Sequence, residues 1–208
     1  MNSAPLSLLD RIRDRVPAQA PSVAQMDQAQ AAVLMAITDA SQPRLILTRR
    51  AEHLNNHAGE VAFPGGKRDP ADLSAEMTAL RESQEEIALP STAVDIVGPM
   101  PMSVSKLGLQ VVPFVGIIPH QTRLTPSEDE IDLIFQVPLT FFLEQPPVNY
   151  TEREFQGVRY RIPCFHYEGQ VIWGLTAFFI TDFCNRVFDS GFDFFRPTPV
   201  GTSKGDAS

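Results

Sequence analysis

The stretch from Gly59 to Leu89 constrains this chain more than any other. It begins as a short apolar run, turns at a Pro-Gly-Gly sequence (residues 64–66), crosses a polar loop and ends in a predicted helix. Three glutamates near the end of this helix, Glu82, Glu85 and Glu86, are spaced i, i+3 and i+4. Side chains at this spacing project from one face of a helix, so negative charge is concentrated there.

Crowded carboxylates on one helix face need a physical reason. Like charges one turn apart destabilise a helix by roughly 0.2–0.5 kcal/mol, and acids near its C-terminal end oppose the helix dipole. A hard divalent cation would offset this cost, because Mg²⁺ and Mn²⁺ prefer carboxylate oxygens. The alternative is a solvated acidic helix, which the spacing alone favours. On the opposite side, Met77, Leu80 and Ile87 predict the buried face of the helix.

The residues of this helix also carry a family signature. Arg81, Glu82, Glu85, Glu86 and Leu89 occur in the order of the Nudix box. The stretch therefore resembles the Nudix hydrolases, which hydrolyse a nucleoside diphosphate linked to another moiety.

The length of one loop and three positions depart from the family pattern. The loop between Gly66 and Arg81 is longer by one residue, and Asp72 displaces or replaces the usual loop glutamate. Ser83 stands where an apolar residue is usual, and Ala88 stands where a glycine is usual.

The residues before the box resemble one branch of the family, the coenzyme A diphosphatases. The positions that follow the signature of this branch are Ile46, Leu47, Thr48, Arg50, Ala51, Gly59, Phe63, Pro64, Gly65 and Gly66. Asn55 stands where this signature has a second arginine. The resemblance implies a three-layer α/β/α sandwich with a mixed sheet, whereas the pattern of elements alone indicates only an α/β or α+β fold.

Composition limits the classes of partner. The chain has 208 residues, of which 43% are hydrophobic, and a formal charge of −8. This balance predicts an ordinary globular protein that binds neither nucleic acid nor an acidic membrane surface. Residues 43–68 are the exception, since five basic and two acidic residues give them a net charge of +3. This segment suits an anionic substrate, and the resemblance implies that the partner is a small nucleotide.

Length and cysteine content predict one soluble domain in a reducing compartment. The two cysteines, Cys164 and Cys184, are too few for a disulfide framework, and no signal peptide or membrane-spanning run is recognisable. We expect a cytoplasmic protein, and the sequence leaves open whether it forms a homodimer. The predicted parts are an N-terminal helix and linker (1–24), a Nudix hydrolase domain (25–195) and a disordered tail (196–208).

Strand and helix signals surround the box. Strands are predicted at 31–37, 45–49 and 110–119, with helices at 7–16, 138–143 and 174–188. Ser74, or alternatively Asp72, is a candidate N-cap of the box helix, and Pro90 ends it. Pro113 lies inside the most apolar strand and predicts an edge position or a bulge there.

Metal and substrate contacts follow from these patterns. We expect Glu82 and Glu86, one helical turn apart, to hold Mg²⁺ or Mn²⁺, with Glu85 completing a second site or accepting a proton. Neighbouring strand residues point to opposite faces, so only one of Arg49 and Arg50 can face the substrate, and the resemblance favours Arg50. The backbone of Gly65 and Gly66 would allow close approach to the cation and substrate. Arg81 is expected to fix the helix against the loop.

The sequence offers several candidates for the general base and does not choose among them. The candidates are Glu85, Glu128 and Glu130, with Glu60 as a weaker one. Glu128 and Glu130 belong to the sequence SEDE, which is either a solvated loop or a loop that carries an acid to the site. His53 and His57 are expected in loop or surface roles.

The resemblance implies metal-dependent hydrolysis of coenzyme A to 4′-phosphopantetheine and 3′,5′-ADP. Asn55 favours an alternative, a Nudix enzyme that acts on ADP-ribose or NADH. A non-catalytic nucleotide-sensing module is a third interpretation, which the retention of all three glutamates opposes. A decapping role fits poorly with the acidic composition.

Overall fold

The protein is described here by a computed structural model of residues 6–54, 56–155, 158–192 and 198–199. The helices are α1 (Leu8–Arg15), α2 (Val23–Met26), α3 (Ala75–Ile87), α4 (Leu139–Glu144) and α5 (Gly174–Phe188), with short 3₁₀ turns at Val16–Gln19 and Ser91–Ala93. The predicted tail lies outside the described residues except for Thr198–Pro199, which form β12. Within the described residues, no helix combines the length and apolarity needed to cross a membrane.

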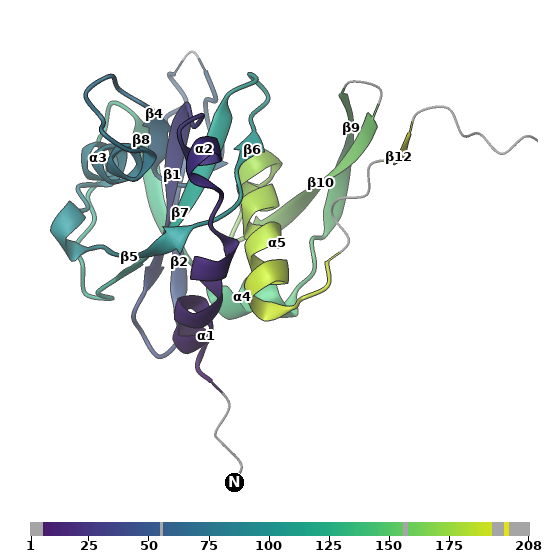
Figure 1. Ribbon diagram of the computed structural model, residues 1–208, viewed down its shortest axis with the longest axis horizontal. Coiled ribbons are helices and arrows are strands. Elements are labelled where there is room, and N and C mark those ends of the chain that lie inside the picture. Colours follow the sequence, from purple (N-terminus) through teal and green to yellow (C-terminus); the bar gives the residue numbers. More distant parts are fainter. Residues whose placement is uncertain (1–5, 55, 156–157, 193–197, 200–208) are drawn as a thin grey trace, which may run out of the picture.

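A mixed eight-stranded sheet forms the centre of the molecule (Figure 1). Its strands are β1 (Ala31–Thr38), β2 (Arg44–Arg50), β3 (Val61–Ala62), β4 (Gly65–Lys67), β5 (Asp95–Pro99), β6 (Ser103–Val104), β7 (Gln110–Ile118) and β8 (Ile131–Pro138). The main path runs β3-β2-β1-β7-β5, while β4 pairs with β1, β6 with β7 and β8 with β2. Only β1 and β7 pair in parallel among these contacts, so the predicted mixed sheet is confirmed.

Helices cover both faces of this sheet. Alternate residues of β1 show this directly, because Met35 and Ile37 pack with α1 and α5 while Leu34 packs with α3. Successive strand side chains point to opposite faces, which is why one strand contributes to two cores. The three-layer α/β/α sandwich is therefore confirmed, with α3 on one side and α1 and α5 on the other (Figure 1).

A second sheet extends from the body beside α5 (Figure 1). Its strands are β9 (Asn149–Phe155), β10 (Val158–Tyr167), β11 (Gln170–Ile172) and β12. Strand β10 pairs antiparallel with the other three. Aromatic rings of Phe141 and Phe142 in α4 pack edge-on against Tyr167 and Phe165, which joins β10 to the central core.

Helix α3 buries a different face from the predicted one. Met77 is 44% exposed, so its predicted burial is wrong, whereas Ile87 is fully buried as predicted. The residues that face the sheet are mostly small, and they are Ala75, Thr78, Ala79 and Ser83, followed by Glu86 and Ile87. Small side chains let the helix axis lie close to β1 and β4, and a count of large apolar residues misses such a face.

Pro113 lies in an interior strand, so the predicted edge position is wrong. Its carbonyl accepts a hydrogen bond from Met100 N (2.8 Å), on the side where the chain passes from β5 to β6. In a strand, the nitrogen and the carbonyl of one residue point to the same side. The nitrogen of Pro113, which carries no hydrogen, therefore faces the residues that connect β5 to β6 and not a paired strand residue. The register irregularity lies in β5, between Ile96 and Gly98.

Both ends of α3 have defined caps. Ser74 Oγ accepts a hydrogen bond from Met77 N (3.2 Å), which confirms Ser74 as the N-cap. Ala88 ends the helix in the left-handed conformation (φ 53°, ψ 31°), and its N–H bonds to Gln84 O. A glycine adopts this conformation without strain, whereas alanine does so at a cost of roughly 1–2 kcal/mol.

Replacing Ala88 with glycine is therefore expected to stabilise the protein. The expected gain in free energy of unfolding is about 1 kcal/mol, since relief of strain outweighs the extra freedom of glycine in the unfolded chain. Urea unfolding monitored by circular dichroism measures it. Ala93→Gly is the matched control, because Ala93 does not have a positive φ and its replacement should be neutral or destabilising. Equal effects of the two changes would contradict this explanation.

Candidate functional site

The carboxylate of Glu86 is the most enclosed charged group of the box helix. Only 3% of the residue is exposed. Gly65 N donates to its Oε2 (2.9 Å), and Arg50 Nη1 donates to its Oε1 (3.2 Å). One side chain of α3 thus connects to the double-glycine turn and to the end of β2.

Burial controls the protonation of Glu86. It raises the pKa of this carboxyl to about 7, because removal from water disfavours the charged form. The Gly65 N–H and the Arg50 guanidinium act in the opposite direction, and the nearby charges of Glu82 and Glu130 raise the pKa further. Glu86 is enclosed and near other acids, and the Gly65 N–H and Arg50 offset its negative charge only in part. Such a carboxylate would bind a cation favourably.

Glu82 lies directly against the second glycine of the turn. A Cβ atom placed on Gly66 would lie 2.4 Å from the carboxyl carbon of Glu82, closer than side chains tolerate. Burial also raises the pKa of Glu82, and the charge of Arg81 opposes this shift. The glycine at position 66 therefore leaves the room that the Glu82 carboxylate occupies.

Arg81 ties the helix to the preceding loop, as predicted. Its Nε and Nη2 donate to the two carboxylate oxygens of Asp72 (3.1 and 3.0 Å), and Nη2 also reaches Lys67 O (3.1 Å). Asp72 is 7% exposed and also accepts a hydrogen bond from Thr78 Oγ1 (2.9 Å). The Arg81 guanidinium holds the pKa of Asp72 down to about 2. Asp72 therefore positions Arg81 and does not act as the helix N-cap.

Glu85 is the most exposed of the three glutamates of the box. Its carboxylate is 60% exposed and pairs with Arg81 Nη1 at 2.9 Å. Arg81 Nη2 also contacts Glu82 Oε1 at 3.0 Å. Within the ranges that the structure describes, no three acidic, histidine or cysteine side chains converge as a ready-made metal site. Glu82 and Glu86, which face the double glycine, are the pair whose surroundings fit a hard divalent cation.

The two adjacent arginines of β2 lie on opposite faces of the sheet. Arg50 points to the α3 side, where it meets Glu86. Arg49 pairs in register with Val61 and Leu133, and Val61 belongs to the core on the α5 side. The Nε of Arg49 is buried without a hydrogen-bond partner in the structure. The structure thus brings Arg50, but not Arg49, to the glutamates.

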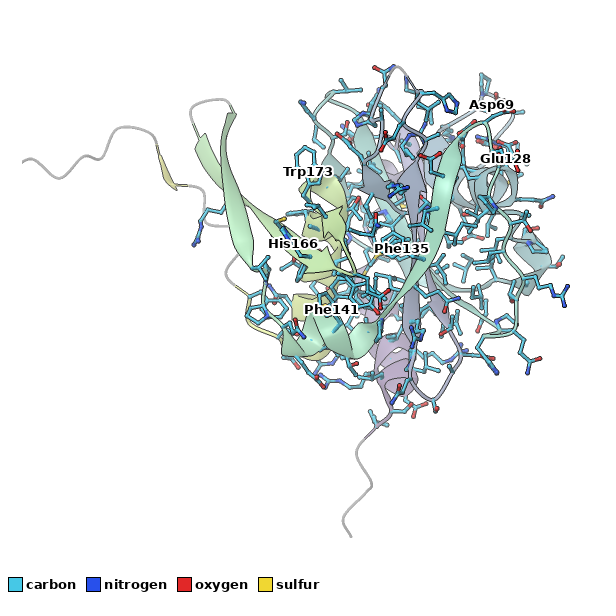
Figure 2. The ribbon with its side chains drawn as sticks, turned by 180° about the vertical axis from the view of Figure 1, so that it is seen from behind. Asp69, Glu128, Phe135, Phe141, His166 and Trp173 are labelled. Carbon is cyan, nitrogen blue, oxygen red and sulfur yellow. The ribbon has the colours of Figure 1, made fainter. Side chains whose placement is uncertain are left out.

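The candidates for the general base differ in their surroundings and in their effect on Glu82 and Glu86. Glu130 is close enough for its charge to raise the pKa of both. Glu128 is exposed on the α3 side of the molecule, where Figure 2 also shows Asp69, far from Phe141 and His166. Glu60 pairs with His57 Nδ1 at 2.6 Å. Glu130 is therefore the candidate whose charge acts on both enclosed carboxylates, whereas that of Glu85 acts on Glu82.

The loop that follows β2 is joined to the loop that carries Glu130. Ala51 N donates to Glu130 O (2.9 Å), and Glu52 N donates to Asp132 Oδ2 (3.2 Å). His53 Nε2 lies 3.1 Å from Asp129 O. Sequence reasoning missed Asp132, because its position depends on a register shift of β8 against β2 between Arg49 and Arg50.

Comparison with known proteins identifies the family. A family model described as the NUDIX domain matches residues 28–163. The chain belongs to the Nudix family. It is 43% identical to the Nudix hydrolase NudL of Yersinia enterocolitica over 157 residues, which cover 76% of this chain and 80% of NudL. It is 39% identical to NudL of Cronobacter sakazakii over 189 residues, or 90% of this chain and 98% of the relative.

Among solved structures, the protein is similar to the NUDIX domain of Shewanella oneidensis NrtR, solved with ADP-ribose. The TM-score is 0.45 and the identity 21%, over 62% of this chain and 85% of that domain. As a Nudix hydrolase, the protein cleaves the diphosphate bond of a nucleoside diphosphate derivative. Nudix hydrolases generally use a divalent ion such as Mg²⁺ or Mn²⁺ for this reaction.

The raised pKa of Glu86 predicts a pH-dependent stability of the metal-free protein. Its ordinary value is 4.5 and its folded value about 7, so the folded state holds a proton that the unfolded state has lost between these pH values. The free energy of unfolding should therefore fall by about 2–3 kcal/mol, relative to Glu86→Gln, as pH rises from 4.5 to 7. Urea unfolding in the presence of a chelator measures this. Parallel pH profiles of the two proteins would contradict the assignment.

Proposed function

We propose that the protein hydrolyses the diphosphate bond of coenzyme A or one of its derivatives. The products would be 4′-phosphopantetheine and 3′,5′-ADP. One observation carries the proposal: Arg50, from the signature that resembles coenzyme A diphosphatases, pairs with Glu86 of the Nudix box at 3.2 Å. The two signatures therefore meet at one point, beside the double-glycine turn.

In this proposal, Glu82 and Glu86 hold a Mg²⁺ or Mn²⁺ ion. Such an ion neutralises the negative oxygens of a diphosphate and lowers the pKa of a bound water. The pair fits because Glu86 is nearly fully enclosed and Glu82 lies against a position without a side chain. Glu85 is more exposed and pairs with Arg81, so we assign it to a second ion or to proton transfer.

Substrate contacts are assigned to the surface around Glu86. Arg50 supplies positive charge for a phosphate, and the backbone of Gly65 and Gly66 allows a close approach. Arg49 lies on the other face of the sheet, so we assign it no contact with the reacting phosphates.

Glu130 is the proposed general base. It belongs to a loop that is hydrogen-bonded to Ala51, directly after Arg50, and its charge acts on both Glu82 and Glu86. A carboxylate in this place can accept the proton of the attacking water. Glu128 and Glu60 are the second choices, since the charge of Glu128 is not among those that raise the pKa of Glu82 or Glu86 and Glu60 is paired with His57.

A second candidate function is hydrolysis of ADP-ribose or NADH. It is favoured by Asn55, which stands where the coenzyme A signature has an arginine. Asn55 lies outside the described residues. In either case we propose a cytoplasmic enzyme whose partner is a small nucleotide.

Glu86→Gln is expected to reduce turnover by more than tenfold with saturating Mg²⁺ or Mn²⁺, which corresponds to about 1.4 kcal/mol of activation barrier. The change keeps the size of the side chain and removes the charge that holds the cation. Calorimetric titration with Mn²⁺ should show weaker binding at the same time. Glu76→Gln, in the first turn of α3, is the matched control and should resemble the wild type. Retention of more than about a tenth of the turnover by Glu86→Gln would exclude Glu86 as a ligand.

Initial rates on four substrates test the substrate assignment. Coenzyme A and acetyl-coenzyme A should be hydrolysed faster than ADP-ribose and NADH at equal concentration, and phosphate-ester products identify the bond that is cut. Equal or faster hydrolysis of ADP-ribose would overturn the coenzyme A assignment in favour of the second candidate. Binding of these ligands without any product would favour a sensing module.

A further inference from the structure

Segment 51–54 contacts the loop that contains Glu130 at three successive points. From one end to the other, these are Ala51 N to Glu130 O, Glu52 N to the Asp132 carboxylate and His53 Nε2 to Asp129 O. The first two involve backbone N–H groups of the segment and remain possible with any side chain. The third depends on the imidazole of His53.

The contacts link Glu130 to the enclosed carboxylate by a short path. Arg50 bonds Glu86, the next residue bonds the Glu130 carbonyl, and the loop itself is closed by Glu130 N and Ile131 N, which both donate to Ser127 O (2.9 and 2.8 Å). Ser127 N in turn donates to Glu86 O (2.8 Å). Residues 127–132, the base loop, are thus fixed at one end to α3 and at the other to segment 51–54.

The middle of the base loop has fewer attachments. Glu128, Asp129 and Glu130 are all exposed, so packing does not fix them. The described contacts at Asp129 include one hydrogen bond from a side chain, that of His53. Loss of this bond would detach Asp129 from segment 51–54, while the backbone of Glu130 would keep its bonds to Ser127 and Ala51, so the effect would fall on the loop directly before Glu130.

We propose that His53 is a positioning residue for the reaction, which holds the base loop so that Glu130 stays beside Glu82 and Glu86. Its Nε2–H donates to the carbonyl of Asp129, one residue before Glu130. The inference rests on the proposed function, because it takes Glu130 as the base. His57, in the same loop, bonds the side chain of Glu60 and has no part in this attachment.

Two substitutions separate the hydrogen bond from the histidine ring. His53→Ala removes the donor and is expected to lower kcat by about tenfold with KM changed less than twofold, because a displaced base affects the chemical step. His53→Gln keeps a side-chain N–H donor and should restore most of kcat. His166→Ala is the control, since His166 is exposed on β10, on the side of α5 and far from Glu128 (Figure 2).

A double-mutant cycle with Glu130→Gln tests whether His53 acts through Glu130. If it does, His53→Ala should cause no further loss of kcat in the Glu130→Gln protein. Hydrogen exchange adds a readout independent of turnover: the amides of Glu130 and Ile131 should exchange faster in His53→Ala and regain protection in His53→Gln.

Three results would overturn the inference: an unchanged kcat in His53→Ala, multiplicative losses in the double mutant, or a loss confined to KM. Each of these leaves the metal site intact, so Glu86→Gln would still be inactive. An active Glu86→Gln would instead show that the proposed function is wrong. The two failures are therefore distinguishable in the same set of variants.

Discussion

The contact of Glu86 with Gly65 and Arg50 is the interaction on which the site depends. An enclosed carboxylate is costly unless hydrogen-bond donors and positive charge surround it. Here the donors come from the first glycine of the turn and from the last residue of β2, so α3, β2 and β4 must meet at one place. The small residues along the sheet side of α3 permit this approach, and Gly66 leaves space for Glu82.

Positioning and chemistry are divided between neighbouring side chains of α3. Arg81 gathers Asp72, Glu82 and Glu85 around one guanidinium, so it fixes the loop and at the same time keeps Glu85 turned outward. Ser83 takes an apolar position of the family pattern but is fully buried, and its hydroxyl donates to Ala79 O at 2.6 Å. The buried hydroxyl of Ser83 therefore has a hydrogen-bond partner within the helix, and the polar residue at this position does not disturb α3.

Much of this arrangement could be predicted from the sequence, where local rules apply. Helical spacing placed Glu82 and Glu86 together but not the exposed Glu85, the cap at Ser74 was correct, and strand alternation separated Arg49 from Arg50. The buried face of α3 could not be predicted from its large apolar residues, because the close approach of the sheet selects small ones. The choice among the acids of the SEDE sequence was also beyond local rules, since it depends on how β8 pairs with β2 at the bulge.

The proline in β7 has a consequence for how this architecture can vary. Because Pro113 cannot donate a hydrogen bond toward the residues between β5 and β6, a continuous strand at this place would lack one ladder bond to β7. Residues 100–102, which connect β5 to β6, lie on the far side of β1 from β2, and Met100 N bonds Pro113 O there. Met100 is buried, whereas Pro101 and Met102 are partly exposed, so residues inserted after Met100 would lengthen the connection from β5 to β6 away from α3 and from Arg50 on β2.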